Sequence, residues 1–244
     1  MPSLVADQRI AVALDETSDV VALPDGTFLV VSDTEPRAAL VRAGSVAYLD
    51  LPGVSDGDSG LEAVAFDPAT GRLVSYAEER AELLVHRWDG TASSPAVLAS
   101  RHAFRFGKKK NKGVEGIAFF GAKLLCANEA KPRGLFVVDL GLDDVTEVAL
   151  DEAILAACDD FSGLAYDARR GTHLLVSDES AALVELALEE RSGGVAGRLR
   201  AAHALVDERG EPLERVEGVA VDPSGAWWVL LENERVLCRV RAAG

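Results

Sequence analysis

A short pattern that recurs five times constrains the fold of this chain more than any other feature. Each copy begins with a polar or acidic residue, continues through a small and an apolar residue, and leads through a turn into a second apolar strand. The lead residues are separated by 43, 53, 47 and 55 residues. They are Asp19, Glu62, Glu115, Ser162 and Glu217. One four-stranded propeller blade with variable loops has this length.

The turns within the copies are typical of β-hairpins. Asp-Pro-x-x-Gly and Pro-Asp-Gly segments combine a preset proline φ with a glycine that tolerates positive φ. The returning strands are almost continuously apolar, as expected when both faces are covered. They are predicted at 28–32, 73–77, 124–127, 174–177 and 227–231. The sequence therefore predicts an all-β chain: a β-propeller of five four-stranded blades, with six as the alternative, in a single domain spanning 1–244.

The last blade reaches the C-terminus before it can form a fourth strand. The apolar segment 8–14 precedes the first hairpin and could supply that strand. We therefore expect the N-terminal strand to pair with the last blade and to close the ring, which would remove two exposed sheet edges. A short helical turn is predicted at 151–158.

The repeat concentrates carboxylates at one mouth of the channel. In an antiparallel hairpin, the residue that opens the first strand lies beside the residues that close the second. Asp19, Glu62, Glu115 and Glu217 are predicted to face the axis, while Ser162 breaks the ring. The channel-rim residues are predicted to be Asp33, Glu78, Asn128, Glu129, Asp178, Glu179 and Glu232, together with Ser162.

A ring of four ionised carboxylates needs a counter-charge. At about 7 Å each pair repels by about 2 kcal/mol at an effective dielectric of about 20, and six pairs sum to the order of 10 kcal/mol. Oxygen ligands without a His or Cys cluster favour a hard cation, Ca²⁺ first and Mg²⁺ second. Pairing with arginines is the alternative. The candidates are Arg37, Arg80, Arg133 and Arg235.

Charge and composition limit the partners. The chain has 40 acidic residues against 25 Lys and Arg, a net charge of −15, which repels phosphate backbones. Nucleic acid is therefore not expected as a partner, whereas a protein partner stays open. No apolar stretch is long enough to span a membrane, and no leader is recognisable, so we expect a soluble, cytoplasmic protein, periplasmic only if a leader has been removed.

One basic run departs from this acidic composition. Lys109, Lys110 and Lys112 immediately precede Glu115, which places them at the predicted channel mouth. They are interpreted either as a solvated loop or as an anion-steering loop that brings a small anionic ligand to a cation held by the glutamates.

Four segments together resemble one family. They are 111–118 (NKGVEGIA), 159–165 (DDFSGLA), 177–180 (SDES) and 216–220 (VEGVA). In combination with the five repeats, the chain resembles the SdiA-regulated (YjiK-like) proteins, a β-propeller group related in shape to calcium-dependent lactonases and phytases. The resemblance implies a channel site near Glu62, Glu115 and Glu217 that holds calcium, and it implies no particular reaction.

Two classes of function follow. The first is a Ca²⁺-binding scaffold or ligand-binding module with an acidic channel site. The second is a Ca²⁺-dependent hydrolase of phosphoester or lactone type, with Glu129 or Glu179 as the base. Binding is favoured because hydrolytic propellers add a histidine or a second metal shell, and the sequence shows neither.

Overall fold

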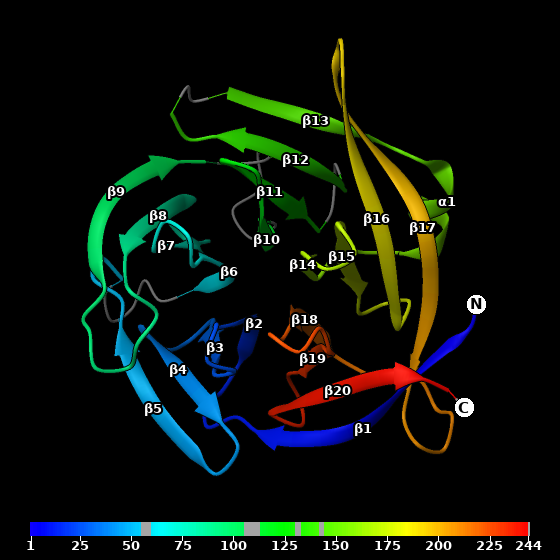
Figure 1. Ribbon diagram of the computed structural model, residues 1–244, viewed down its shortest axis with the longest axis horizontal. Coiled ribbons are helices and arrows are strands. Elements are labelled where there is room, and N and C mark those ends of the chain that lie inside the picture. Colours follow the sequence, from blue (N-terminus) through cyan, green and yellow to red (C-terminus); the bar gives the residue numbers. More distant parts are fainter. Residues whose placement is uncertain (55–59, 105–112, 130–132, 142–143, 244) are drawn as a thin grey trace.

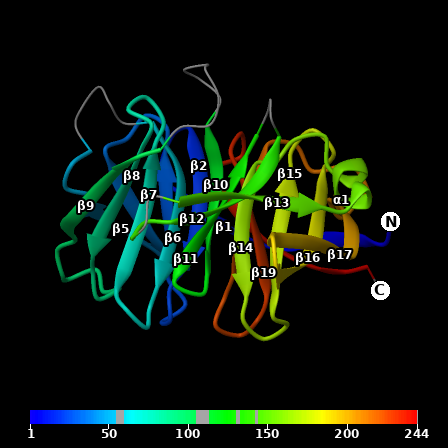
Figure 2. The ribbon, with the colours of Figure 1, turned by 90° about the horizontal axis from the view of Figure 1, so that it is seen from above.

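The chain folds as a ring of antiparallel strands around a central axis (Figure 1). The computed structural model describes residues 1–54, 60–104, 113–129, 133–141 and 144–243. Seen from the side, the strands run between the two faces of the ring (Figure 2). The chain is all-β and propeller-like, apart from one short helix, α1 (Glu152–Ala157), which confirms the predicted helical turn.

Within these described ranges the strands fall into five consecutive groups, each ordered from the axis outward. The first is β2 (Thr17–Ala22), β3 (Phe28–Ser32), β4 (Arg37–Arg42) and β5 (Ser45–Asp50). The second is β6 (Leu61–Asp67), β7 (Arg72–Ala77), β8 (Glu82–Arg87) and β9 (Val97–Ala103). The third is β10 (Val114–Phe120), β11 (Lys123–Asn128), β12 (Gly134–Asp139) and β13 (Asp144–Leu150).

The last two groups follow the same order from the axis outward. The fourth is β14 (Gly163–Asp167), β15 (Thr172–Ser177), β16 (Ala182–Arg191) and β17 (Gly194–Val206). The fifth is β18 (Val216–Val221), β19 (Trp227–Leu231), β20 (Val236–Ala242) and the N-terminal strand β1 (Ser3–Ala11). β1 pairs antiparallel with β20 from Leu4 to Ala11, so the outermost strand of this group comes from the other end of the chain.

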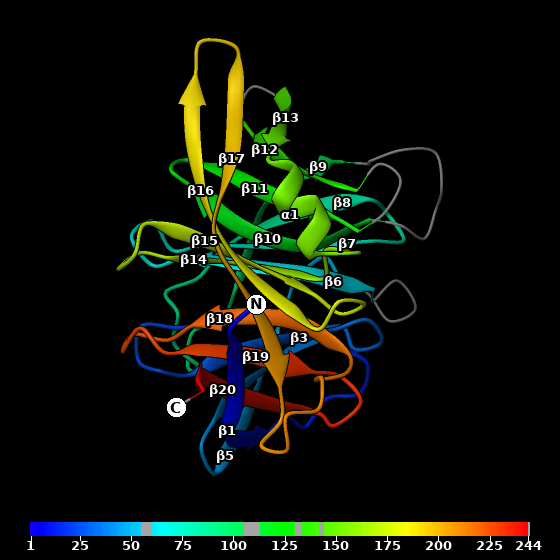
Figure 3. The same cartoon turned by 90° about the vertical axis from the view of Figure 1, so that its right-hand side faces the viewer.

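The long outer strand β17 also joins its neighbours, which the sequence did not predict. Its first part pairs in parallel with β13, where Val148 lies opposite Val195. Its last part pairs in parallel with β1, where Ser3 lies opposite Ala204. The β16–β17 hairpin extends beyond the rest of the ring (Figure 3). These contacts join the third, fourth and fifth groups into one continuous sheet.

The hydrophobic core lies between the groups. Among the described residues, each interface between neighbouring groups has its own buried cluster. Leu29 and Leu73, for example, meet between the first and second groups and are both fully buried. The returning strands are buried on both faces, which explains their continuously apolar sequences. The innermost strands β2, β6, β10, β14 and β18 are thereby held side by side around the axis.

Candidate functional site

Three glutamates converge at one end of the channel because each sits in a β-bulge. The pairing register of the innermost strand shifts at Glu62, at Glu115 and at Glu217. At a bulge one extra residue stands opposite a single partner residue, and its side chain is turned away from the regular pleat. The repeated bulge therefore gives the three side chains equivalent positions around the axis.

The predicted position of Asp19 is wrong by one residue. In the first group the same register shift falls at Ser18, so Ser18 is the counterpart of the three glutamates. Asp19 is fully buried, and its Oδ1 and Oδ2 accept hydrogen bonds of 2.8 Å from the N–H groups of Val20 and Val64. Burial, with the nearby Glu62 charge, holds the pKa of Asp19 well above its usual range, against the opposing effect of these two hydrogen bonds.

Asp19 belongs to a waist that narrows the channel. Its counterparts in the third, fourth and fifth groups are Gly116, Gly163 and Gly218, where the inner strands approach backbone to backbone. A Cβ on Gly163 would lie 2.8 Å from the Cα of Gly218, and one on Gly116 would lie 2.6 Å from the Leu164 nitrogen. Only glycine fits such an approach. The waist therefore separates the two ends of the channel.

Above the waist lies an acidic pocket of about 300 Å³. Its lining contains eight of the predicted site residues, and two that were not predicted, Asp160 and Arg215. The eight are Glu62, Glu78, Glu115, Glu129, Ser162, Asp178, Glu179 and Glu217. The lining does not include the predicted Asp19, Asp33, Asn128 and Glu232. Asp33 and Glu232 lie close enough to raise the pKa values of Glu62 and Glu217, respectively.

The electrostatics of the pocket favour uptake of positive charge. Burial, and after it the charge of Glu115, raises the pKa of Glu62 to about 9. Burial and Glu129 raise the pKa of Glu115 to about 8, and burial and Asp178 raise that of Glu217 to about 7. Burial also raises the pKa of Glu78. Without a cation, Glu62 and Glu115 favour their protonated forms at neutral pH, because burial and repulsion by neighbouring carboxylates disfavour their charged forms.

The fourth group supplies a carboxylate that the repeat alone does not reveal. Ser162 is buried, and its hydroxyl donates a 2.7 Å hydrogen bond to the Val216 carbonyl. The acid comes instead from Asp160, which precedes the strand and accepts hydrogen bonds from the Ser177 hydroxyl and the Glu179 N–H. The adjacent acidic pair Asp159–Asp160, two residues before the repeat, was the available signal.

Each of the four predicted arginines contacts a group outside the acidic pocket. Arg37 pairs with Glu35 and Arg235 with Asp15. Arg80 donates to the Gly53 carbonyl, and Arg133 to the carbonyls of Leu155 and Cys158.

The arginine in the pocket wall is Arg215. Its Nε lies 3.0 Å from Glu232 Oε2, and one terminal nitrogen lies 3.7 Å from Glu217 Oε1. Its side chain is 51% exposed, so solvent screens these pairs. In the sequence, the signal for this arginine was its position two residues before Glu217. Arg215 offsets only part of the acidic charge of the pocket.

Two further observations concern the predicted ligands. Among the described residues, no three His, Cys, Asp or Glu side chains stand close enough together to hold a metal ion as they are now placed. Lys109, Lys110 and Lys112 lie outside the described residues.

Within the described ranges, no helix is long and apolar enough to cross a membrane.

Comparison with known proteins places the chain in a family. The model of the SdiA-regulated family matches residues 71–236, which is more than half of the chain. The chain therefore belongs to the SdiA-regulated family, as the repeat motifs indicated.

Solved structures show the same fold at low sequence identity. Glutaminyl cyclase from Myxococcus xanthus has a TM-score of 0.64 and 13% identity, with 98% of this chain and 96% of that chain covered. A putative oxidoreductase (glucose dehydrogenase) from Thermus thermophilus has a TM-score of 0.58 and 17% identity, with 98% and 100% covered. A PQQ-bound aldose sugar dehydrogenase from Streptomyces coelicolor has a TM-score of 0.58 and 15% identity, with 100% and 99% covered.

Proposed function

We propose that the acidic pocket binds a divalent cation, Ca²⁺ before Mg²⁺, and that the protein is a binding or scaffold module built on this site. The observation that carries the proposal is the convergence of Glu62, Glu115 and Glu217 on one pocket with raised pKa values. Carboxylate oxygens are the donors that Ca²⁺ and Mg²⁺ prefer. A cation could replace the protons that these buried carboxylates retain.

The donor set fits a hard cation in its chemistry, while the present spacing of the described residues offers no ready-made set of three ligands. The glutamates are the residues that would hold the ion, since both Asp19 oxygens already accept backbone hydrogen bonds. Ca²⁺ tolerates irregular coordination and retained waters better than Mg²⁺ does. This difference supports the order Ca²⁺ before Mg²⁺ in a pocket of about 300 Å³.

The architecture proposed with this function is a five-bladed propeller closed by β1. The antiparallel register between β1 and β20 supports closure, and the five consecutive strand groups of the described chain support the blade number. In this arrangement the acidic pocket is the mouth of the channel. A small anionic ligand could join the cation there, with Arg215 in the pocket wall as its counter-charge.

The test is calorimetric titration of the EDTA-treated protein with Ca²⁺ and then with Mg²⁺. We expect saturable Ca²⁺ binding with proton release at pH 7, strongly weakened by Glu115→Gln. Glu152→Gln on α1 is the matched control, because Glu152 is exposed and is not among the residues lining the pocket. Absence of Ca²⁺ binding by the folded wild type, or equal binding by Glu115→Gln, would reject the site.

A Ca²⁺-dependent hydrolase is the second candidate. It is favoured by Glu129 and Glu179, which line the same pocket as the three glutamates and could serve as the base. Chromogenic phosphoester and lactone substrates, assayed with and without EDTA, separate the two proposals. Turnover that EDTA abolishes and Glu129→Gln or Glu179→Gln reduces would establish the enzyme, and Ca²⁺ binding without turnover would leave a binding module.

A further inference from the structure

A second pocket, of about 250 Å³, lies at the opposite end of the channel. It is lined by residues near the ends of all five innermost strands. Three of these strands, β6, β10 and β18, supply a glutamate to the acidic pocket at their other end. The waist formed by Asp19 and the glycines lies between the two pockets. This pocket has no role in the proposed cation site.

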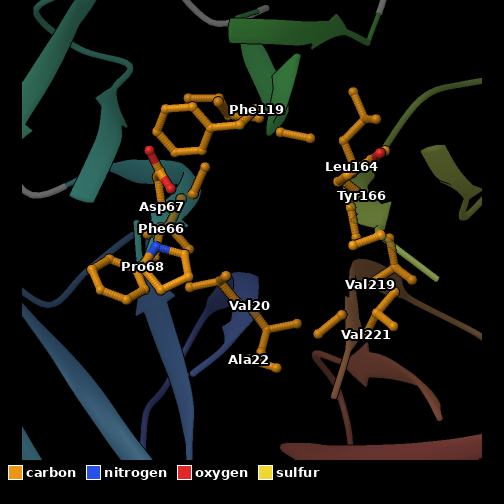
Figure 4. Close-up of a pocket in the computed structure, with 18 residues that line it drawn as sticks. Val20, Ala22, Phe66, Asp67, Pro68, Phe119, Leu164, Tyr166, Val219 and Val221 are labelled. Atoms are coloured by element: carbon orange, nitrogen blue, oxygen red, sulfur yellow. The ribbon is translucent and has the colours of Figure 1, made fainter. Parts of the chain in front are cut away.

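The walls of the second pocket are apolar and partly aromatic. One position of the repeat provides Ala22, Phe66, Phe119, Tyr166 and Val221, and Figure 4 shows these residues around a central space. The ring of Phe66 is turned away from this space and packs against Trp88, with ring centroids 5.4 Å apart. Tyr166 is 46% exposed. Its ring stacks at a tilt against His173, with ring centroids 4.9 Å apart, and is thus held in place at the rim. A ring-shaped apolar molecule suits such walls.

The inner strand edges add hydrogen-bonding groups to these walls. Each innermost strand is paired on one side only, so alternate N–H and C=O groups face the axis. Val20 and Val64 show this orientation directly, because their N–H groups donate to Asp19. The backbone groups of Ala22 and Phe66, two residues further on, face the same way into the second pocket. A buried backbone donor or acceptor requires a partner.

The charges around the pocket disfavour an ionic ligand. Asp67 is the acidic residue in its lining, and it is already engaged. Its Oδ1 accepts a 3.0 Å hydrogen bond from the Ala69 N–H, and its Oδ2 lies 3.8 Å from an Arg72 nitrogen. The net charge of −15 also repels anions. A neutral molecule therefore meets the lowest desolvation cost in this pocket.

We infer that this second pocket binds a small neutral molecule with a flat aromatic ring and an amide-like group. The ring packs against Phe119 and Tyr166, and the amide-like group donates to and accepts from the strand edges. This pocket is separate from the cation site, so the two proposals are tested independently.

Benzamide, benzoate and benzylamine are suitable probes, since they share a ring and differ in charge at pH 7. Saturation-transfer NMR detects the weak binding expected of such small ligands. We expect saturable binding of benzamide and no saturable binding of benzoate, whereas benzylamine, a cation, also reports on the acidic pocket. Failure of benzamide to bind the folded wild type, or equal binding of benzamide and benzoate, would overturn the inference.

Variants locate the binding. Ala22→Phe enlarges the side chain at a lining position where the repeat already carries phenylalanine in the second and third groups, so the fold should tolerate it. We expect loss of benzamide binding in Ala22→Phe and weakened binding in Tyr166→Ala, which removes an exposed ring. Val97→Phe on the outer strand β9 adds a ring at a residue that is 57% exposed and serves as the control. Unchanged benzamide binding in both Ala22→Phe and Tyr166→Ala would contradict the placement.

Discussion

The two ends of the central channel share the innermost strands β6, β10 and β18 but differ in chemistry. At one end, Glu62 and Glu115 line a pocket whose polar groups are mostly carboxylates. Four residues later on the same strands, Phe66 and Phe119 line a pocket that is mostly apolar. The backbone repeat is shared, so the difference lies in side chains at two positions of the repeat. The fold provides equivalent positions, and the residues there determine what each end can bind.

The comparison also shows how the ends are kept apart. The waist between them contains Asp19, Gly116, Gly163 and Gly218, where backbones approach closely and side-chain space is lacking. A bulge directly precedes Gly116 and Gly218, and it turns the neighbouring glutamate towards the mouth. The acidic pocket and the apolar pocket are therefore separated by the backbone of the waist.

The largest expected effect comes from adding a side chain where the backbones approach closely in the waist. Gly163→Ala would place a Cβ 2.8 Å from the Gly218 Cα and 3.0 Å from the Glu217 carbonyl oxygen. We expect a loss of about 3 kcal/mol or more in the free energy of unfolding, because backbone must move. Gly193→Ala, where nothing lies within 4 Å, should change it by less than about 0.5 kcal/mol. Equal urea midpoints for the two variants would show that the waist is not tightly packed.

Removing the buried acid of the waist should cost nearly as much. Asp19→Ala leaves the N–H groups of Val20 and Val64 without their acceptor, and we expect a loss of about 2 to 4 kcal/mol. Asp25→Ala is the matched control, because the Asp25 carboxylate accepts a 2.9 Å backbone hydrogen bond in an exposed turn. Denaturant unfolding measures both. A loss in Asp19→Ala no greater than in Asp25→Ala would contradict the structural role of Asp19.

The acidic end should make stability depend on pH. The pKa values of Glu62, Glu115 and Glu217 rise from about 4.5 to about 9, 8 and 7 in the folded protein. At pH values between the unfolded-state pKa and the folded-state pKa, these glutamates hold protons in the folded state that they have lost in the unfolded chain. The free energy of unfolding therefore falls as pH rises from about 5 to 9.

Glu217 alone contributes on the order of 3 kcal/mol to this fall. Thermal unfolding of the EDTA-treated protein at pH 5, 7 and 9 measures the trend. Glu217→Gln should flatten it, since glutamine carries no proton to lose. A free energy of unfolding that rises from pH 5 to pH 9 would contradict this prediction, because it would show that the carboxylates are stabilised in their charged forms.

The smallest expected effect concerns the wall of the acidic pocket. Arg215 lowers the pKa of Glu217, so Arg215→Ala should raise that pKa further. The shift should be modest, because the Arg215 side chain is 51% exposed and solvent screens its charge. NMR titration of the glutamate side chains reports it. A pKa of Glu217 that falls in Arg215→Ala would refute the pairing.

Much of the fold could be predicted from the sequence because its signals are local. Apolar returning strands such as Trp227–Leu231 and turn residues such as Gly225 have their own patterns, and the structure places strands there. The parallel pairing of β17 with β13 and β1 could not be predicted in this way. It joins residues far apart in sequence, such as Ser3 and Ala204, and leaves no periodic signature.

The candidate site could be predicted only in part, because the sequence motif shows the aligned positions but not the exact place of each bulge. The motif aligned Glu62, Glu115 and Glu217 correctly, since each stands at the same bulge. It failed at Asp19, because a one-residue shift moves a side chain from the mouth into the waist. The apolar pocket was missed, although the repeat already aligned Phe66, Phe119 and Tyr166 at one position.

The proposed cation site depends on the glutamates of the acidic end. Anomalous diffraction from a crystal grown with Ca²⁺ at pH 8 tests it most directly. We expect one anomalous peak in the acidic pocket, with carboxylate oxygens of Glu62, Glu115 or Glu217 at about 2.3 to 2.6 Å from the ion. An acidic pocket without a peak, in a crystal saturated with Ca²⁺, would contradict it.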